Sequence, residues 1–174
     1  MRSQIKSSQP LGLFFSFSEK KFKFLFTQKT NRAAFMVHKM AVDEHNVKLE
    51  IWDTAGQGRY RSLAPMYYRG ASAAVIVYDI TKKDSFETMK RWIDELKVRA
   101  PPNIVLAIAG NKSDLESERA VPIAYAQEFL KQIEEGGGER PIFSECSAKN
   151  GDGIQKLFTD VCRKLIAMAE SESV

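Results

Sequence analysis

Two stretches of the chain, residues 73–79 (AAVIVYD) and 104–111 (IVLAIAGN), are almost unbroken runs of apolar residues. Strands buried on both faces of a parallel sheet have this pattern, whereas a strand with one solvated face alternates between apolar and polar residues. Residues 141–146 (PIFSEC) form a shorter run of the same kind. Because parallel strands need long crossover connections, these runs predict an α/β protein with helices between its strands.

Helical patterns lie between and after these runs. Apolar residues recur at spacings of three and four within residues 84–98, 126–133 and 153–168, which predicts three helices. Asp84 or Ser85 is placed to cap the first of them. The alternation of strands and helices predicts a doubly wound, mostly parallel sheet with helices on both faces.

The chain before these runs has a different pattern. Residues 35–42 and 47–52 read as strands, and the second of them alternates cleanly between apolar and polar residues. The polar turn DEHN at 43–46 lies between them. A turn of this length and composition predicts an antiparallel hairpin.

Basic residues are concentrated at the start of the chain. Residues 1–32 hold seven Lys and Arg against one Glu, whereas the rest of the chain holds 19 basic and 21 acidic residues. Such an arm could bind nucleic acid or an anionic membrane, or could be a solvated lead-in; we expect no nucleic-acid partner. We divide the chain into an atypical basic segment (1–32), in which residues 21–26 fit a first strand, a domain (33–169) and a short tail (170–174).

The cysteines and the lengths of the apolar runs indicate the cellular compartment of the protein. Cys146 and Cys162 lie in apolar surroundings, and their spacing does not fit a zinc site. Unpaired cysteines are typical of a reducing compartment, so we expect a cytoplasmic protein. No apolar run approaches the ~18 residues that a membrane span needs.

Polar residues follow three of the predicted strands, at 53–57 (DTAGQ), 111–114 (NKSD) and 147–149 (SAK). In doubly wound folds, ligands bind at the carboxyl ends of the strands. An acid, a glycine and an amide at 53–57 could serve a metal, a phosphate and a water, or could form a polar turn. Each segment alone has little specificity, because Asn and Asp are common in turns. Together and in this order, the three segments indicate a ligand site.

The segment at 111–114 suits one ligand class. The Asp114 carboxylate can accept two parallel hydrogen bonds, from a ring N–H and an exocyclic amine, and guanine offers that edge whereas adenine does not. Lys112 can lay its methylene stem along the base, and Asn111 can tie neighbouring loops together. A backbone N–H of residues 147–149 can meet a base carbonyl oxygen, while the Ser147 side chain braces the loop.

These motifs together resemble the guanine-nucleotide-binding proteins of the Ras superfamily, and most closely the Rab family of small GTPases. The resemblance covers residues 33–169 and includes WDTAGQ, VYDIT, AGNKSDL and ECSAKN in the family's order. The phrase LAPMYYRGA at 63–71 is a Rab hallmark and looks like the early-endosome branch. The resemblance implies the small G-protein fold and a GTP/GDP switch in endosomal vesicle traffic.

The resemblance also implies roles for individual residues. Asp53 would hold Mg²⁺ through a water, the Gly56 N–H would contact the γ-phosphate, and Gln57 would orient the attacking water in catalysis. Guanine would be selected by Asn111, Lys112, Asp114, Ser147, Ala148 and Lys149. Effectors would read a surface that includes Tyr60, Leu63, Met66 and Tyr67. The implied partners are guanine nucleotide, effectors, exchange factors and GTPase-activating proteins, and the implied location is peripheral on endosomal membranes.

The chain departs from the family pattern in the phosphate site. No stretch reads G-x-x-x-x-G-K-[ST], the loop whose backbone N–H groups and lysine hold the phosphates. Thr30 stands three residues before Ala33, at the offset of the family's Mg²⁺-binding threonine, but Asn31 and Arg32 replace the expected Ile-Gly. Gly58 replaces the usual Glu. We therefore expect an incomplete fold that lacks the phosphate loop and first helix, with weakened GTP, GDP and Mg²⁺ binding.

Three hypotheses account for these departures. The chain is a working GTPase with an unusual phosphate site, a nucleotide-poor protein-binding module, or the product of exon skipping or an incorrect gene model derived from an ordinary Rab. We favour the third. The chain ends AESESV without a cysteine to prenylate, so no stable membrane anchor is expected. Loss of the first helix is expected to expose the apolar face of the sheet beside the strands at 73–79 and 104–110.

Overall fold

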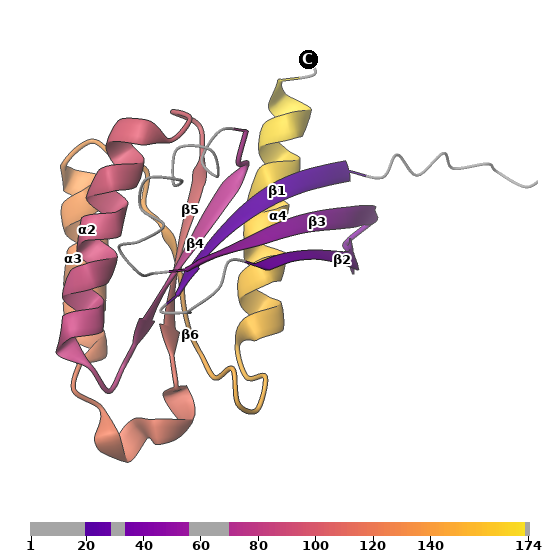
Figure 1. Cartoon of the computed structure of the whole chain (residues 1–174). Coiled ribbons are helices and arrows are strands. Elements are labelled where there is room, and N and C mark those ends of the chain that lie inside the picture. The colour runs from indigo at the N-terminus through magenta and orange to yellow at the C-terminus, as the bar shows by residue number, and fades with distance from the viewer. Residues whose placement is uncertain (1–19, 29–33, 56–69, 173–174) are drawn as a thin grey trace, which may run out of the picture.

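The structure is a computed structural model of the chain, and it describes residues 20–28, 34–55 and 70–172. In these residues six strands form one sheet in the order β2-β3-β1-β4-β5-β6 (Figure 1). They are β1 (Lys20–Gln28), β2 (Ala34–Val42), β3 (His45–Ala55), β4 (Ala73–Asp79), β5 (Val105–Asn111) and β6 (Ile142–Cys146). Neighbouring strands pair in parallel except β2, which is antiparallel to β3. The predicted doubly wound, mostly parallel sheet is confirmed.

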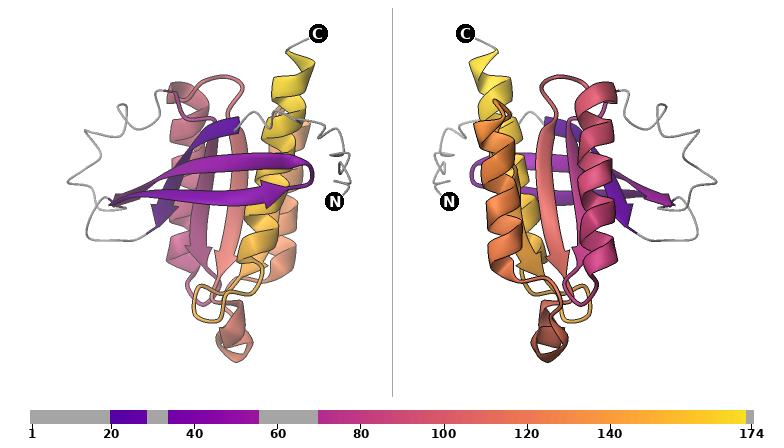
Figure 2. Two further views of the ribbon diagram at one scale, coloured as in Figure 1. Left: turned by 90° about the vertical axis from the view of Figure 1, so that its right-hand side faces the viewer. Right: turned by 90° about the vertical axis from the view of Figure 1, so that its left-hand side faces the viewer.

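Helices cover both faces of the sheet. The described helices are α2 (Lys83–Arg99), α3 (Ile123–Glu135) and α4 (Ile154–Ser171), with the short 3₁₀ helix η2 (Ser113–Glu118) between β5 and α3. Figure 2 shows α2 and α3 on one face and α4 on the other. None of the described helices is long and apolar enough to cross a membrane.

The start of α2 differs from the expected cap. Lys82 is the N-cap residue and makes no side-chain cap hydrogen bond, so neither Asp84 nor Ser85 caps the helix. The Ser85 hydroxyl instead donates to the Lys82 carbonyl at 2.7 Å and accepts from the Asp79 N–H at 2.9 Å. Ser85 therefore ties the first turn of the helix back to the end of β4.

The strand β1 lies in the middle of the sheet. All nine of its residues are in register with β3, and Phe24 to Thr27 are also in register with β4. This strand contains the segment 21–26 that the sequence offered as a first strand. The sheet therefore draws on residues from both sides of the composition shift near residue 32.

Successive residues of β4 pack into two different cores. Ala74, Ile76 and Tyr78 join the core under α2 and α3, whereas Ala73 and Val75 join the core under α4. Side chains alternate between the two faces of a strand, so a strand covered on both faces must be apolar at successive positions. This explains the unbroken apolar run in the sequence.

The exposure expected from a missing first helix is not found in β4 and β5. Ala73, Val75, Ala107 and Ala109 are all buried, because α4 packs Leu157 and its neighbours against this face. That prediction is wrong for these two strands.

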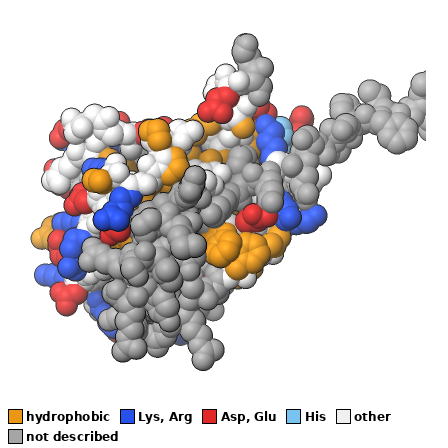
Figure 3. All heavy atoms as spheres, turned by 45° about the horizontal axis from the view of Figure 1, so that its top comes forward, with side chains coloured by type: hydrophobic (Ala, Val, Ile, Leu, Met, Phe, Trp, Pro, Cys, Tyr) orange, Lys and Arg blue, Asp and Glu red, His pale blue; other side chains and the backbone are white. Residues whose placement is uncertain are grey.

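The exposed large hydrophobic side chains of the described sheet lie instead on β2. Phe35, Met36 and Val37 are 52%, 59% and 45% exposed. Figure 3 shows hydrophobic side chains at the surface of the molecule, beside residues that are not described. The tilted rings of Phe35 and Trp52 are 4.7 Å apart between centroids, so the hydrophobic surface continues onto β3.

We predict that Leu157→Ala lowers the free energy of unfolding by about 2–4 kcal/mol, because it leaves a cavity between α4 and the sheet. Leu157 is 2% exposed. The matched control is Val98→Ala on α2, where the side chain is 82% exposed and the expected change is within about 0.5 kcal/mol. Urea denaturation of both variants measures the difference. Equal effects would show that α4 does not hold this face of the sheet.

Candidate functional site

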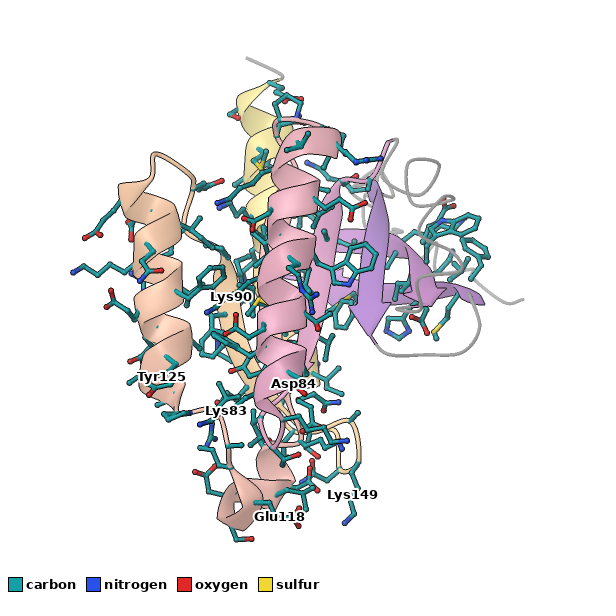
Figure 4. The ribbon with its side chains drawn as sticks, turned by 60° about the vertical axis from the view of Figure 1, so that its left-hand side comes forward. Lys83, Asp84, Lys90, Glu118, Tyr125 and Lys149 are labelled. Carbon is teal, nitrogen blue, oxygen red and sulfur yellow. The ribbon has the colours of Figure 1, made fainter. Side chains whose placement is uncertain are left out.

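The carboxyl ends of β4, β5 and β6 meet at one end of the molecule. The register pairs Asp79 with Asn111 and Asn111 with Cys146, so the loops after these strands begin at the same level. Figure 4 shows Glu118 of η2 and Lys149 of the loop after β6 at this end, where α2 also begins. The predicted segments 111–114 and 147–149 are therefore neighbours.

Asn111 joins the two loops. Its side-chain oxygen accepts hydrogen bonds from the Lys112 N–H at 2.8 Å and from the Ala148 N–H at 3.0 Å. The Ala148 N–H, one of the backbone groups of residues 147–149 that the sequence offered as donors to a base carbonyl, thus donates to Asn111 in this structure. The amide of Asn111 fixes the separation of the two backbones.

Ser147 holds the carboxylate of Asp114. Its hydroxyl donates to Asp114 Oδ1 at 2.5 Å and accepts from the N–H groups of Lys149 and Asn150 at 3.3 and 3.4 Å. Ser147 is completely buried. The other carboxylate oxygen, Oδ2, lies 3.9 Å from the ammonium of Lys149. A buried hydroxyl thus fixes the orientation of a carboxylate whose second oxygen faces a cation.

Lys112 has an unusual backbone and a paired side chain. Its φ of 73° and ψ of 35° place it in the left-handed region, which costs energy for a residue other than glycine. Its ammonium lies 2.8 Å from Asp79 Oδ2. The hydrogen bond to Asp79, and then its charge, raise the pKa of Lys112. Burial opposes ionisation of Asp79, but hydrogen bonds from Lys112 and Thr81 outweigh it and lower its pKa.

A second tie between the loops lies behind Asp114. The Arg119 guanidinium contacts both carboxylate oxygens of Glu145 at 2.7 Å, and it also contacts Glu116 and the Val121 carbonyl. The hydrogen bonds that Arg119 donates to Glu145 and then to Glu116 raise the pKa of Arg119 above its usual range. Arg119 and Glu145 are only 16% and 17% exposed, so the pair is largely shielded from solvent.

Two glycines allow close approaches in this part of the fold. A Cβ on Gly110 of β5 would lie 2.8 Å from the hydroxyl of the buried Tyr78 on β4. Gly153 has a φ of +73°, and a Cβ there would lie within 3.2 Å of Cys146 and still closer to the Glu145 carbonyl. Both positions therefore require glycine for steric reasons.

Asp53, the other predicted site residue within the described part of the chain, is not part of this cluster. Asp53 is near the end of β3, in register with Phe26 of β1 and Ala34 of β2. Two strands, β1 and β4, separate β3 from β5 in the sheet. Within residues 20–28, 34–55 and 70–172, no group of three or more His, Cys, Asp or Glu is arranged to hold a metal ion. The remaining predicted residues lie outside the described residues: Thr30, Gly56, Gln57, Tyr60, Leu63, Met66 and Tyr67.

The sequence reasoning missed Asp79, Arg119 and Glu145. Asp79 ends an apolar strand and could have been found by the same strand-end rule that selected Asn111. Glu145 is a charged residue within the run PIFSEC, and a charge in such a strand requires a partner. Arg119 carries no comparable signal, because nothing in the sequence places it beside β6.

A comparison with protein-family models matches residues 10–167 to the Ras family. The chain belongs to the Ras family. The resemblance to the Rab family and to its early-endosome branch, drawn from the motifs, is confirmed by similar proteins of that kind.

Three of these similar proteins show how much sequence identity the chain shares with Rab proteins. The chain is 55% identical over 140 residues to the putative ras-related protein Rab-5B of Dictyostelium discoideum. It is 49% identical over 141 residues to the ras-related protein Rab-31 of Mus musculus, and 47% identical over 140 residues to the ras-related protein Rab-5A of D. discoideum. The matches cover 80%, 81% and 80% of this Ras-family chain and 63%, 69% and 67% of the relatives. The chain thus spans less than two thirds of the length of Rab-5B.

We predict that Arg119→Met destabilises the two loops of this Ras-family chain, because it leaves Glu145 shielded and unpaired. The expected loss is about 1–3 kcal/mol, with faster amide hydrogen exchange in residues 112–121 and 147–153. Arg163→Met is the matched control, because Arg163 makes a similar two-armed pair with Asp43 at 2.9 and 2.7 Å on an exposed surface. The control should lose much less stability, because an exposed ion pair is screened by solvent. Unchanged exchange in both loops would contradict the role of Arg119.

Proposed function

We propose that the chain is a Rab-type protein that binds guanine nucleotide in endosomal vesicle traffic, with binding weakened by the lack of a phosphate loop. The observation that carries this proposal is the Asp114 carboxylate held by the buried Ser147 at the carboxyl ends of β5 and β6. The names of the Rab-5 and Rab-31 relatives support the choice of process.

The chemistry of the cluster fits guanine. A fixed carboxylate can accept from both the ring N–H and the exocyclic amine of that base, and a shielded carboxylate left unpaired by another base would be costly. Asn111, Lys112 and Asp114 follow β5, while Ser147, Ala148 and Lys149 follow β6. GTP and GDP are the proposed ligands on this ground.

The phosphate half of the site is the weak half. Only residues 29–33 separate the end of β1 from the start of β2, and they are too few for a G-x-x-x-x-G-K-[ST] loop and a helix. Backbone N–H groups and a helix N-terminus supply much of the attraction for phosphates in such proteins. Asp53 would still hold Mg²⁺ through a water, and Gly56 would still contact the γ-phosphate. The contacts that the phosphate loop makes in other members of the family would be missing.

A second candidate function is supported by the hydrophobic surface on β2. Phe35 and Val37 lie on one face of the edge strand β2 and Met36 on the other, and all three are exposed. Large hydrophobic side chains exposed together are typical of a protein-binding surface. On this reading the chain is a nucleotide-poor binding module. Its partners would be the effectors, exchange factors or GTPase-activating proteins of its relatives.

We predict that a fluorescent GDP analogue binds this chain with an affinity in the micromolar range or weaker, because base contacts remain while phosphate contacts are lost. Fluorescence anisotropy measures the dissociation constant with and without Mg²⁺. Asp114→Asn is the control, since an amide presents a donor where guanine also has one and should favour xanthosine diphosphate. Nanomolar, Mg²⁺-dependent binding would indicate another phosphate site.

We predict no detectable intrinsic GTP hydrolysis, although Gln57 is present. A water-orienting amide accelerates attack only when the γ-phosphate is already held in line with the water. A single-turnover assay of phosphate release at saturating GTP tests this, with Gln57→Ala as the comparison. Release by the unsubstituted chain that disappears in the variant would show that the catalytic geometry is intact.

A further inference from the structure

Asp79 uses both of its carboxylate oxygens. Oδ1 accepts from the Thr81 N–H at 2.9 Å and from the Thr81 hydroxyl at 2.7 Å. Oδ2 lies 2.8 Å from the ammonium of Lys112. The Asp79 side chain is 17% exposed, so these contacts are largely shielded from water.

The backbone of Asp79 is also held on two sides. Its N–H donates to the Ser85 hydroxyl of α2 at 2.9 Å, and that hydroxyl oxygen lies 3.0 Å from the Asp79 carbonyl oxygen. On the other side, the N–H of Ile80 donates to the Asn111 carbonyl at 3.0 Å. Asp79 is therefore a rigid point at the junction of β4, β5 and α2.

Lys112, in contrast, has a long side chain that is 43% exposed. Four rotatable bonds separate its ammonium from its backbone, and ordering them during binding would reduce affinity. The backbone of Lys112 is fixed in the left-handed region by its hydrogen bond to Asn111. With both ends held, the methylene stem is ordered before any ligand arrives.

We propose that Asp79 is a positioning residue for guanine-nucleotide binding, which acts by holding the Lys112 stem in place over the base. The inference rests on the function proposed above. Asp79 does not itself touch the base. Pre-organisation of a contact raises affinity by removing the cost of ordering it. The raised pKa of Lys112 and the lowered pKa of Asp79 agree with a stable pair.

The role differs from that of Asp114 in a measurable way. A methylene stem packs against the face of any purine, whereas a carboxylate reads the exocyclic amine at its edge. Loss of Asp79 should therefore weaken the binding of GDP and of inosine diphosphate, which lacks that amine, by the same factor. A general loosening of the loops would disturb Asp114 as well and change the ratio between the two nucleotides.

The test is a set of equilibrium titrations of the full chain with fluorescent GDP and inosine diphosphate analogues. Asp79→Asn should weaken both by about 3- to 10-fold, in keeping with a partly exposed ion pair. Lys112→Met should also weaken both, and adding Asp79→Asn to it should cause no further loss, because residues that act through one contact are not additive. Asp84→Asn, an exposed acid in the first turn of α2, removes the same charge and should leave binding unchanged.

Two results would overturn the inference alone: an unchanged affinity of Asp79→Asn, or the same loss with and without Lys112. If Asp79→Asn does not fold, Thr81→Val is tested in its place. It removes the hydroxyl that donates to Asp79 but keeps the charge of the Asp79 carboxylate, so it should weaken nucleotide binding by a smaller factor. Failure of the unsubstituted chain to bind GDP at any measurable concentration would instead remove the proposed function, and the inference with it.

Discussion

The pairing of β5 with its two parallel neighbours sets the level of the polar groups that follow these strands in the candidate base-binding cluster. Asp79, Asn111 and Cys146 are at one level because β4, β5 and β6 are in register. The loops that follow are then close enough for side chains to join them. A shift of one strand by one residue would turn its side chains to the opposite face and separate these groups. The hydrogen bonds of Asn111 and Ser147 thus depend on the apolar packing that fixes the strands.

The sheet itself depends on β1. That strand pairs with β3 on one side and β4 on the other, so it joins the hairpin of β2 and β3 to the rest of the domain. The face of the sheet opposite α2 and α3 is covered by α4. Its side chains Leu157, Val161 and Cys162 pack into the same core as Leu49 of β3. An exposed ion pair between Asp43 and Arg163 adds a further link between the hairpin and this helix.

The sequence was most informative where a single element decides the pattern. The runs at 73–79 and 104–111 could be recognised as parallel strands because both of their faces are buried. The apolar stripe at 153–168 could be recognised as a helix because one face of that helix is buried. The position of β1 could not be predicted, since pairing with β3 and β4 depends on residues far away in the chain. The same limit applies to the pair of Arg119 and Glu145, which are 26 residues apart and meet only through the fold. Asp79 was different: its place at a strand end was visible in the sequence, but its partner Lys112 was assigned to the base alone.

The candidate base-binding cluster and the stretch where a phosphate loop would be expected belong to separate parts of the chain. The contacts described between these loops join residues 79–148, on β4, β5, β6 and the segments that follow them. The phosphate loop of a Ras-family protein would instead follow β1, where only residues 29–33 are present. A change after β1 would therefore leave in place the hydrogen bonds that hold Asp114. This separation explains how a chain without a G-x-x-x-x-G-K-[ST] stretch can keep the ordered cluster around Asp114, and why the proposed base contacts and phosphate contacts can be tested independently.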